Sequence, residues 1–182
     1  MHELETRILD IDVEIIRKKM LELGAVKVKA ENQTNNIFDF PNRQLLNNKG
    51  YARIRIAEDL LNNKNVYYMT TKKMISQDKF KVMEENEVIV DCPDTAENIF
   101  KTLGLELVQS IKKYRESYKY KNSLIEIDIN DRNFCPFPYL EIETYSEDEL
   151  QEIVNLLGYT MDDTTSKTIY EILGDRGLTP GL

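Results

Sequence analysis

The chain has 182 residues, of which 41% are hydrophobic and 31% are charged, and its formal net charge is −8. This composition is typical of one globular domain with a sizeable core, which excludes a disordered protein. The sequence has no apolar run near the roughly 18 residues of a membrane-spanning helix and no apolar signal-peptide segment. An acidic chain also disfavours binding to nucleic acid. We therefore expect a cytoplasmic protein that engages neither membranes nor nucleic acid.

Alternation of polar and apolar residues predicts strands in the first half of the chain, and apolar residues at helical spacing predict one helix. Asp12 is the expected N-cap of that helix, and Gly24 ends it. Two polar stretches, residues 31–36 and 73–79, are expected to connect strands rather than belong to them. The predicted strands are residues 3–9, 25–30, 37–40, 51–57 and 66–72, and the predicted helix is residues 13–23.

The second half continues with strands, a loop over residues 130–138, and a capping box formed by Ser146 and Glu149. The predicted strands are residues 80–90, 106–110, 113–121, 124–129 and 139–144, and the predicted helices are residues 95–103, 147–157 and 164–173. Sequential strands with short turns indicate an α+β fold, an antiparallel sheet or barrel with helices packed outside. Without a visible domain boundary, residues 1–174 are expected to form a single domain and residues 175–182 a flexible tail.

Several common catalytic systems are excluded by the side chains present. His2 is the only histidine, and Cys92 and Cys135 lack the spacing of metal ligands. Catalysis by Ser-His-Asp or Cys-His, and zinc sites built on histidine, are therefore excluded. The seven glycines form neither a P-loop nor a dinucleotide-binding motif.

Charges recur at alternate positions of the predicted strands, and within most strands they have one sign. Alternate residues of a strand share a face, and the opposite faces of these strands are apolar. The pairs are Glu3 and Glu5 (followed by Arg7), Arg53 and Arg55, Thr70 and Lys72, Glu85 and Glu87, Lys113 and Arg115, Glu126 and Asp128, and Glu141 and Glu143.

These charged faces have two interpretations. An antiparallel sheet exposed to water on one side places charges there, which explains any single strand. Rows of like charge repel, however, and recurrent arginine suits planar recognition of phosphate. A closed barrel with the charges inside would need a polyanion for its bases and divalent metals for its acids. Bases for phosphate and carboxylates for Mg²⁺ are the groups that phosphoryl and nucleotidyl transfer require.

The series of charged residues resembles the CYTH superfamily, also called the triphosphate tunnel metalloenzymes. The matching positions are Glu3-x-Glu5-x-Arg7, Arg53-x-Arg55, Lys72, Glu85-x-Glu87, Lys113-x-Arg115, Asp128 and Glu141-x-Glu143. Members include class IV adenylyl cyclases, thiamine triphosphatases and inorganic triphosphatases. The resemblance implies a closed eight-stranded antiparallel β-barrel with a charged interior and helices packed outside.

The resemblance also implies roles for individual residues. The substrate would be a small-molecule triphosphate, namely ATP, tripolyphosphate or thiamine triphosphate. The bases expected to bind it are Arg7, Arg53, Arg55, Lys72, Lys113, Arg115 and Lys167, the last in a C-terminal helix near the tunnel mouth. The acids expected to bind Mg²⁺ or Mn²⁺ are Glu3, Glu5, Glu85, Glu87, Asp128, Glu141 and Glu143. The residues expected to be catalytic are Glu5, Arg7 and Asp128.

Two further expectations concern single side chains. Clustered carboxylates should repel one another in an empty lumen, so removing the charge of Glu141 is expected to leave the ligand-free fold at least as stable. Lys81 is expected in solvent or at the tunnel mouth.

Three functions stay open. In a class IV adenylyl cyclase, the 3′-hydroxyl of ATP attacks the α-phosphorus and pyrophosphate leaves; the length and the segment Asn36-Ile37-Phe38-Asp39 resemble this branch. In a triphosphatase, water attacks the terminal phosphorus. A non-catalytic polyphosphate- or nucleotide-binding module is the third, because Arg7 replaces the lysine of the family's E-x-E-x-K motif and cannot accept a proton. A homodimer is also left open.

Overall fold

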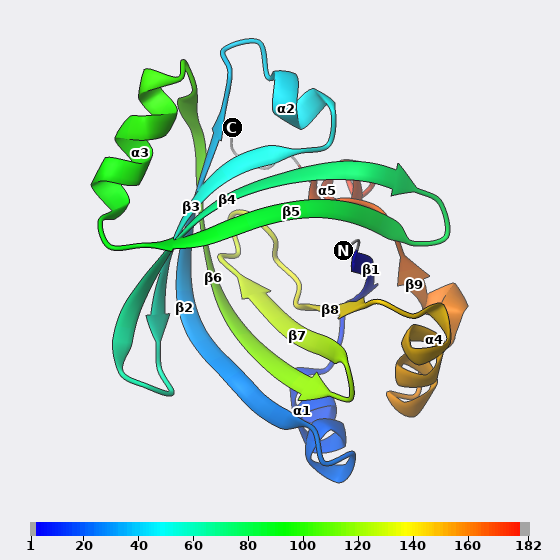
Figure 1. The fold of residues 1–182 in the computed structure, drawn as a ribbon. Helices are drawn as coiled ribbons and strands as arrows, with labels where there is room; N and C mark the ends of the chain where they lie inside the picture. The colour runs from blue at the N-terminus through cyan, green and yellow to red at the C-terminus, as the bar shows by residue number, and fades with distance from the viewer. Residues whose placement is uncertain (1–2, 179–182) are drawn as a thin grey trace.

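The computed structural model describes residues 3–178, and its elements follow the predicted order (Figure 1). The strands are β1 (Glu3–Leu9), β2 (Val26–Asp39), β3 (Tyr51–Asp59), β4 (Lys64–Gln77), β5 (Lys81–Val90), β6 (Glu106–Tyr120), β7 (Ser123–Asn130), β8 (Tyr139–Thr144) and β9 (Thr164–Thr165). The helices are α1 (Val13–Glu22), α2 (Gln44–Asn47), α3 (Pro93–Thr102), α4 (Glu147–Leu156), the 3₁₀ helix η1 (Met161–Asp163) and α5 (Ile169–Asp175).

Eight of the strands close into an antiparallel barrel, as predicted. The hydrogen-bonded order is β5-β4-β3-β2-β6-β7-β8-β1, and β1 pairs back to β5. This last seam is short, because β5 pairs only with the first residues of β1, from Glu3 to Glu5. The same edge of β1 continues with β9, which pairs at Arg7 and Ile8. The charged faces of the strands therefore line one closed lumen.

The apolar faces of the strands point outward and are covered by helices. The largest core cluster packs Ile16 and Met20 of α1 against apolar residues of β7 and β8 such as Ile127 and Leu140, all nearly inaccessible to water. A second cluster lies under α3, where the rings of Phe38 and Phe100 are 5.5 Å apart. Burial of this apolar surface stabilises the barrel from outside, so that the lumen can stay polar.

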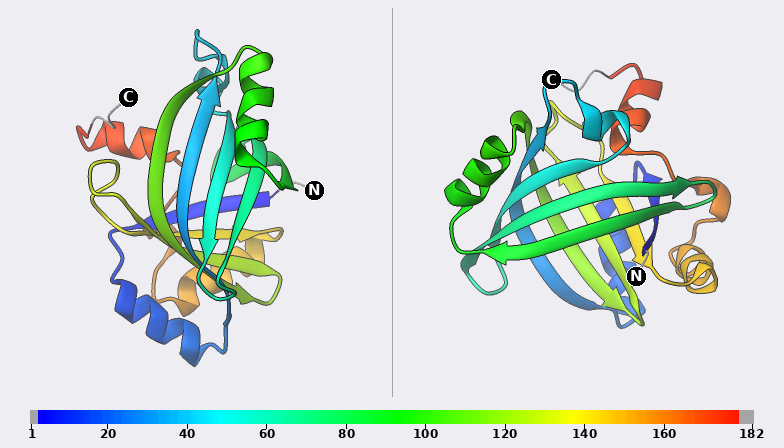
Figure 2. Two further views of the ribbon diagram at one scale, coloured as in Figure 1. Left: turned by 90° about the vertical axis from the view of Figure 1, so that its left-hand side faces the viewer. Right: turned by 45° about the horizontal axis from the view of Figure 1, so that its top comes forward.

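The helices divide between the two ends of the barrel. Figures 1 and 2 show α2 and α5 together at one end, whereas α1 and α4 lie toward the other. An ion pair of 2.8 Å between Lys49, after α2, and Glu171 of α5 joins the first pair of helices. We call the end near α2 and α5 the α5 mouth. None of the described helices has the length and apolar composition of a membrane-spanning helix.

Several predicted boundaries were wrong. The polar stretch 31–36 belongs to β2. Its odd positions line the polar lumen, and Asn32 and Thr34 face outward with no helix over them. Because neither face is apolar there, the sequence does not show the alternation typical of a strand. The two strands predicted over 106–121 are one strand, β6, and β4 extends through residues 73–77.

The last predicted helix, residues 164–173, is also wrong in its start. Thr164 and Thr165 form β9 on the edge of β1 that the short β5 leaves unpaired. The helix α5 begins only after Thr168, which forms a capping box with Glu171. The tail predicted over residues 175–182 lies partly outside the described residues; within them, Arg176 pairs with Asp10 at 2.6 Å.

Candidate functional site: a charged cavity inside the barrel

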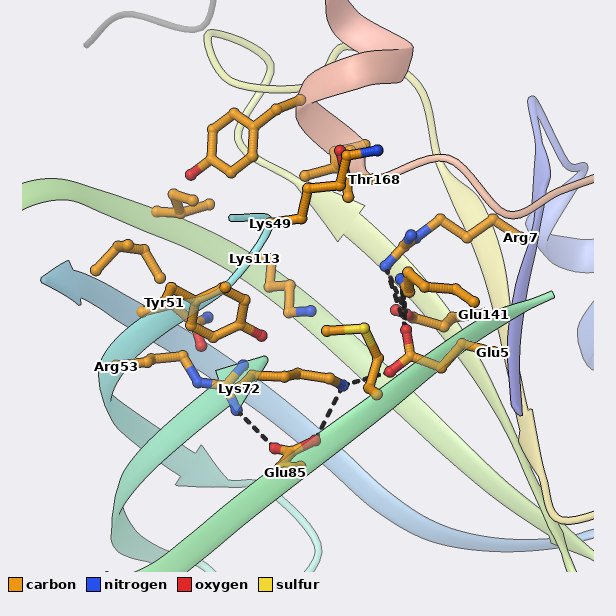
Figure 3. Close-up of a pocket in the computed structure, with 18 of the residues that line it drawn as sticks. Glu5, Arg7, Lys49, Tyr51, Arg53, Lys72, Glu85, Lys113, Glu141 and Thr168 are labelled. Carbon is orange, nitrogen blue, oxygen red and sulfur yellow. Dashed lines mark hydrogen bonds and ion pairs between the residues drawn. The ribbon is translucent and has the colours of Figure 1, made fainter. Parts of the chain in front are cut away.

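The lumen holds a cavity of about 780 Å³ that opens at the α5 mouth. Its wall carries the inward residues of all eight barrel strands, in both signs of charge. Figure 3 shows Arg53, Lys72, Glu85 and Glu5 linked by ion pairs across the cavity, with Arg7 and Glu141 beside them. The charges that the sequence placed on strand faces thus meet around one space.

Arg53 and Arg55 of β3 form a basic wall that is only weakly neutralised. Arg53 reaches Glu85 and Glu87 of β5 at 3.4 and 3.3 Å, and Arg55 reaches Glu87 alone at 3.5 Å. The Nε groups of both arginines are buried and have no hydrogen-bond acceptor among the described residues. Burial and the neighbouring charge of Arg53 lower the pKa of Arg55. This wall therefore has unpaired donors and only long ion pairs, which suits binding of an anion.

Lys113 and Arg115 of β6 extend the basic wall around Asp128 of β7. Arg115 binds Asp128 through two hydrogen bonds of 2.6 Å, and Lys113 donates a third of 2.8 Å. Burial raises the pKa of Asp128, but the charges of Arg115 and Lys113 outweigh it and hold that pKa at about 2. Burial and the charge of Arg115 lower the pKa of Lys113 to about 8. Asp128 thus orients both bases. Arg115 also contacts Glu126 and Glu141, whereas Lys113 has Asp128 as its single carboxylate partner among the described residues.

An acidic cluster lies beside the basic wall. Glu5, Glu141 and Glu143 each offer a carboxylate oxygen, and these oxygens lie within 4.8 Å of one another. Among the described residues, no cation lies within 4.0 Å of Glu143 and no hydrogen bond reaches its side chain. Burial and the charge of Glu126 raise the pKa of Glu143 well above its usual range. Three converging carboxylates, one without a protein partner, fit a hard divalent cation with oxygen ligands.

Glu141 differs from Glu143 in being well neutralised. Arg7 binds it at 2.6 Å and Arg115 at 3.2 Å, and Lys81 lies 4.0 Å away. Burial raises the pKa of Glu141, but Arg7 and Lys81 outweigh it and hold that pKa well below its usual range. The expectation that repulsion between carboxylates dominates around Glu141 is therefore wrong. Among these glutamates, Glu143 is the one whose surroundings are dominated by neighbouring carboxylates.

Two lysines form ion pairs with Glu5. Lys72 of β4 contacts one carboxylate oxygen, and Lys81 of β5 lies 2.5 Å from the other. Lys81 is buried, so its expected place in solvent or at the mouth is wrong. It is the direct cross-strand partner of Glu5 at the seam that closes the barrel. This pairing spans 76 positions of sequence, so alternation along one strand gives no sign of it.

The structure brings most predicted site residues to the cavity wall, with three exceptions, Lys167, Glu3 and Asp128. Lys167 precedes α5 instead of lying in it, and its side chain is exposed and pairs with Asp175 at 2.6 Å; only its carbonyl oxygen contacts the site, through Arg7. The side chain of Glu3 lies outside the described part of the structure. Asp128 lies behind this wall, where it binds Lys113 and Arg115 directly and is linked to Glu141 through Arg115. The predicted residues that line the cavity are Glu5, Arg7, Arg53, Arg55, Lys72, Glu85, Glu87, Lys113, Arg115, Glu141 and Glu143.

The prediction missed part of the wall. Glu126, recognised as facing inward but given no role, is buried and pairs with Arg115. On β2, the inward row Glu31, Gln33 and Asn35 is buried although it was assigned to a connection. Its spacing of two residues is the signal that could have identified it, because it continues the alternation of the predicted strands on either side.

The comparisons with known proteins agree with this geometry. A model of the CYTH domain matches residues 1–169, so the chain belongs to the CYTH family. A protein of Methanocaldococcus jannaschii named putative adenylate cyclase is 27% identical over 184 residues, which cover 96% of this chain and 99% of that protein.

Solved structures show the same fold. A protein of Pyrococcus horikoshii is 25% identical, with a TM-score of 0.75 over 93% of this chain and 98% of its own. A Hippeastrum protein, described as a putative adenylyl cyclase with a dominant triphosphatase activity, is 14% identical, with a TM-score of 0.68 over 98% of this chain and 96% of its own. The likeness to the second protein concerns the fold alone.

Proposed function

We propose that this protein is a metal-dependent adenylyl cyclase of the class IV type, which converts ATP to cyclic AMP and pyrophosphate inside the barrel. One observation carries the proposal: a basic wall with free donors and an acidic cluster with an unpartnered carboxylate adjoin in one cavity. Such a cavity is complementary to a polyanion together with a cation. The full-length similarity to a protein named putative adenylate cyclase supports ATP as the triphosphate.

The basic wall would bind the phosphates. Arg53 and Arg55 line the cavity, and their buried Nε atoms are unpaired among the described residues; Lys113 and Arg115 add charge from the neighbouring side. Charge-assisted hydrogen bonds of this kind are strong and also stabilise a leaving pyrophosphate, whose negative charge grows as it departs. Asp128 would orient Lys113 and Arg115 for this task.

The acidic cluster would hold Mg²⁺ or Mn²⁺ through Glu5, Glu141 and Glu143. When bound, such an ion supplies positive charge to the phosphate and makes a nearby hydroxyl more acidic. The 3′-hydroxyl oxygen would bond to the α-phosphorus while the bond to the pyrophosphate oxygen breaks. The hydroxyl proton would pass to a carboxylate, because Arg7 cannot accept it and is occupied by Glu141 and the Lys167 carbonyl.

Hydrolysis of a triphosphate is the second candidate function. The Hippeastrum protein of the same fold is described as a putative adenylyl cyclase whose dominant activity is that of a triphosphatase. The two reactions would use the same cavity and differ in the attacking group and in the phosphorus attacked.

A turnover screen tests these functions. ATP, tripolyphosphate and thiamine triphosphate would be incubated with Mg²⁺ or Mn²⁺, and cyclic AMP and phosphate would both be measured. Cyclic AMP from ATP supports the cyclase, whereas phosphate from any of the three substrates without cyclic AMP supports the triphosphatase. Binding without either product, and gain of turnover in Arg7→Lys, would show that Arg7 makes the natural chain a binding module.

A further inference from the structure

The cavity wall is not charged throughout. Near the α5 mouth, beside charged residues such as Lys49 and Glu171, it also has an apolar and aromatic part, which we call the apolar wall. Its members come from β2, β6, the loop before β8, and α5, and they are Ile37, Ile111, Phe134 and Tyr170. Tripolyphosphate is charged along its whole length and would leave this surface without a partner. An organic triphosphate has a part that would cover it.

The apolar wall is continuous and held in place. Ile37 of β2 lies directly across from Gln109 of β6 in the sheet, and the Tyr170 hydroxyl donates a 2.7 Å hydrogen bond to the Gln109 Oε1 atom. Phe134 packs edge-on against Tyr170, with ring centroids 6.1 Å apart. Tyr170 lines the cavity, and its hydroxyl is already engaged by Gln109. A planar ligand can pack on such a surface.

Asn35 adds one hydrogen-bonding group beside this wall. On β2 it lies between its cross-strand partners Ile111 of β6 and Arg55 of β3, where the apolar and basic walls meet. It is only 4% exposed. Its Nδ2 atom donates to Gln33 at 3.4 Å, but among the described residues its Oδ1 atom has no partner. A buried carbonyl oxygen left unpaired is costly, and it calls for a donor from a ligand.

We infer that the apolar wall and Asn35 form the subsite for the nucleobase, and that Asn35 makes the site selective for adenine. The inference rests on the proposed function, because it concerns the organic half of the same triphosphate. The phosphates would lie on the basic wall beyond Arg55, and the base would lie toward the α5 mouth. Adenine offers an exocyclic amine as a donor to the free Asn35 oxygen, whereas hypoxanthine has an acceptor oxygen at that position. Asn35 thus determines specificity and takes no part in the chemistry.

Calorimetric titration with ATP, inosine triphosphate and tripolyphosphate tests this assignment. Excess EDTA prevents metal-dependent turnover during the measurement. The natural protein should bind ATP about tenfold more tightly than inosine triphosphate, a difference typical of one hydrogen bond to a buried group. Asn35→Leu should remove that preference by lowering the affinity for ATP about tenfold, and it should leave the affinity for tripolyphosphate within about twofold of the natural protein. The matched control is Thr34→Val, its neighbour on the outer face of the same strand, which should change none of the three affinities.

The outcomes separate this inference from the proposed function. An equal loss for all three ligands in Asn35→Leu would mean that the amide contacts phosphate, and an unchanged preference for ATP would mean that Asn35 does not read the base; either result overturns the inference alone. Failure of the natural protein to bind tripolyphosphate both in EDTA and with added Mg²⁺ would instead count against the proposed function. If Asn35→Leu does not fold, Tyr170→Leu replaces it. This variant should lower the affinity for both nucleotides and leave the affinity for tripolyphosphate unchanged.

Discussion

Two glutamates on opposite faces of the barrel wall show how this fold treats a structural and a functional carboxylate. Glu116 lies on the outer face of β6, is 2% exposed, and is surrounded by donors from α1, β2 and β6. Its partners are Arg17, Lys27, Tyr114 and Tyr118, at distances of 2.5 to 3.1 Å. Glu143 lies on the inner face of β8, and the described residues provide it with no cation within 4.0 Å.

The difference appears in the pKa values. Burial acts to raise the pKa of Glu116, but the hydrogen bonds from Arg17 and Tyr118 lower it to about 2. Burial and the charge of Glu126 raise the pKa of Glu143. The protein surrounds Glu116 with hydrogen-bond donors and leaves Glu143 without a donor among the described residues. A buried charge without a partner is unfavourable, so its presence in a cavity points to a ligand of opposite sign.

The largest expected effect follows from this contrast. Glu143→Gln should reduce metal-dependent turnover by more than about 100-fold, because an amide replaces an anionic metal ligand. Without metal, the variant should be as stable as the parent or more stable, since the substitution relieves repulsion within the acidic cluster. Initial rates with Mn²⁺ and thermal unfolding in EDTA measure the two quantities.

Glu141→Gln is the comparison that sharpens this prediction. It should also lose turnover, but it should lower the free energy of unfolding as well, because Arg7 and Arg115 lose their partner. If Glu143→Gln were the less stable of the two in EDTA, the division of roles between these carboxylates would be wrong.

The next largest effect concerns the outer face. Glu116→Gln should lower the free energy of unfolding by about 1.5 to 3 kcal/mol, because an amide replaces a buried carboxylate that accepts charge-assisted hydrogen bonds from Arg17 and Lys27. Turnover per folded molecule should not change, since Glu116 faces away from the cavity. Denaturant titration and active-fraction kinetics separate the two. A loss of turnover at full folding would place Glu116 in communication with the site and contradict its structural role.

An effect of similar size is expected on the basic wall. Arg55→Ala should weaken binding of tripolyphosphate by about 1.5 to 3 kcal/mol, or roughly 10- to 100-fold, because it removes one charge-assisted contact. Among the described residues, Arg55 has one ion pair of 3.5 Å and a cation–π contact with Tyr68 to lose, so the ligand-free fold should be destabilised little. Arg132→Ala, at an exposed position outside the cavity wall, is the matched control for charge. An equal loss of tripolyphosphate affinity in both variants would mean that Arg55 acts through long-range electrostatics and not through a direct contact.

The sequence was sufficient to predict the barrel and most of its inner wall for a physical reason. Each strand with an apolar outer face and a charged inner face carries a period of two that local reading detects, as Arg53 and Glu141 illustrate. β2 lacks that contrast over residues 31–36, because its outer face is polar there: Asn32 and Thr34 have no helix over them, and Asn36 meets α3 through a hydrogen bond to Glu97. The row containing Asn35 was therefore predicted as a connection.

The pairing of charges across strands could not be predicted from alternation. Glu141 and Glu143 occupy equivalent positions on β8, yet one meets Arg7 and Arg115 while the other meets no cation among the described residues. Which carboxylate is left for a ligand depends on the register of neighbouring strands and on the closure of the barrel. The burial of Lys81 has the same origin, since it depends on pairing between β1 and β5.

The smallest expected effect is the pH dependence of stability, in which the two glutamates should act with opposite sign. The pKa of Glu116 is lower in the folded than in the unfolded state, so its contribution to stability is complete above the unfolded value of about 4.3 and is lost as the pH falls toward 2. The difference between the parent and Glu116→Gln should therefore shrink by about 2 kcal/mol over that range. The pKa of Glu143 is higher in the folded state, so the parent should gain stability relative to Glu143→Gln as the pH falls through that raised value and the carboxyl becomes neutral. Unfolding free energies of the three proteins between pH 7 and pH 2, measured in EDTA, give both slopes, and slopes of the same sign would contradict the assignment of one carboxylate to the fold and the other to a cation.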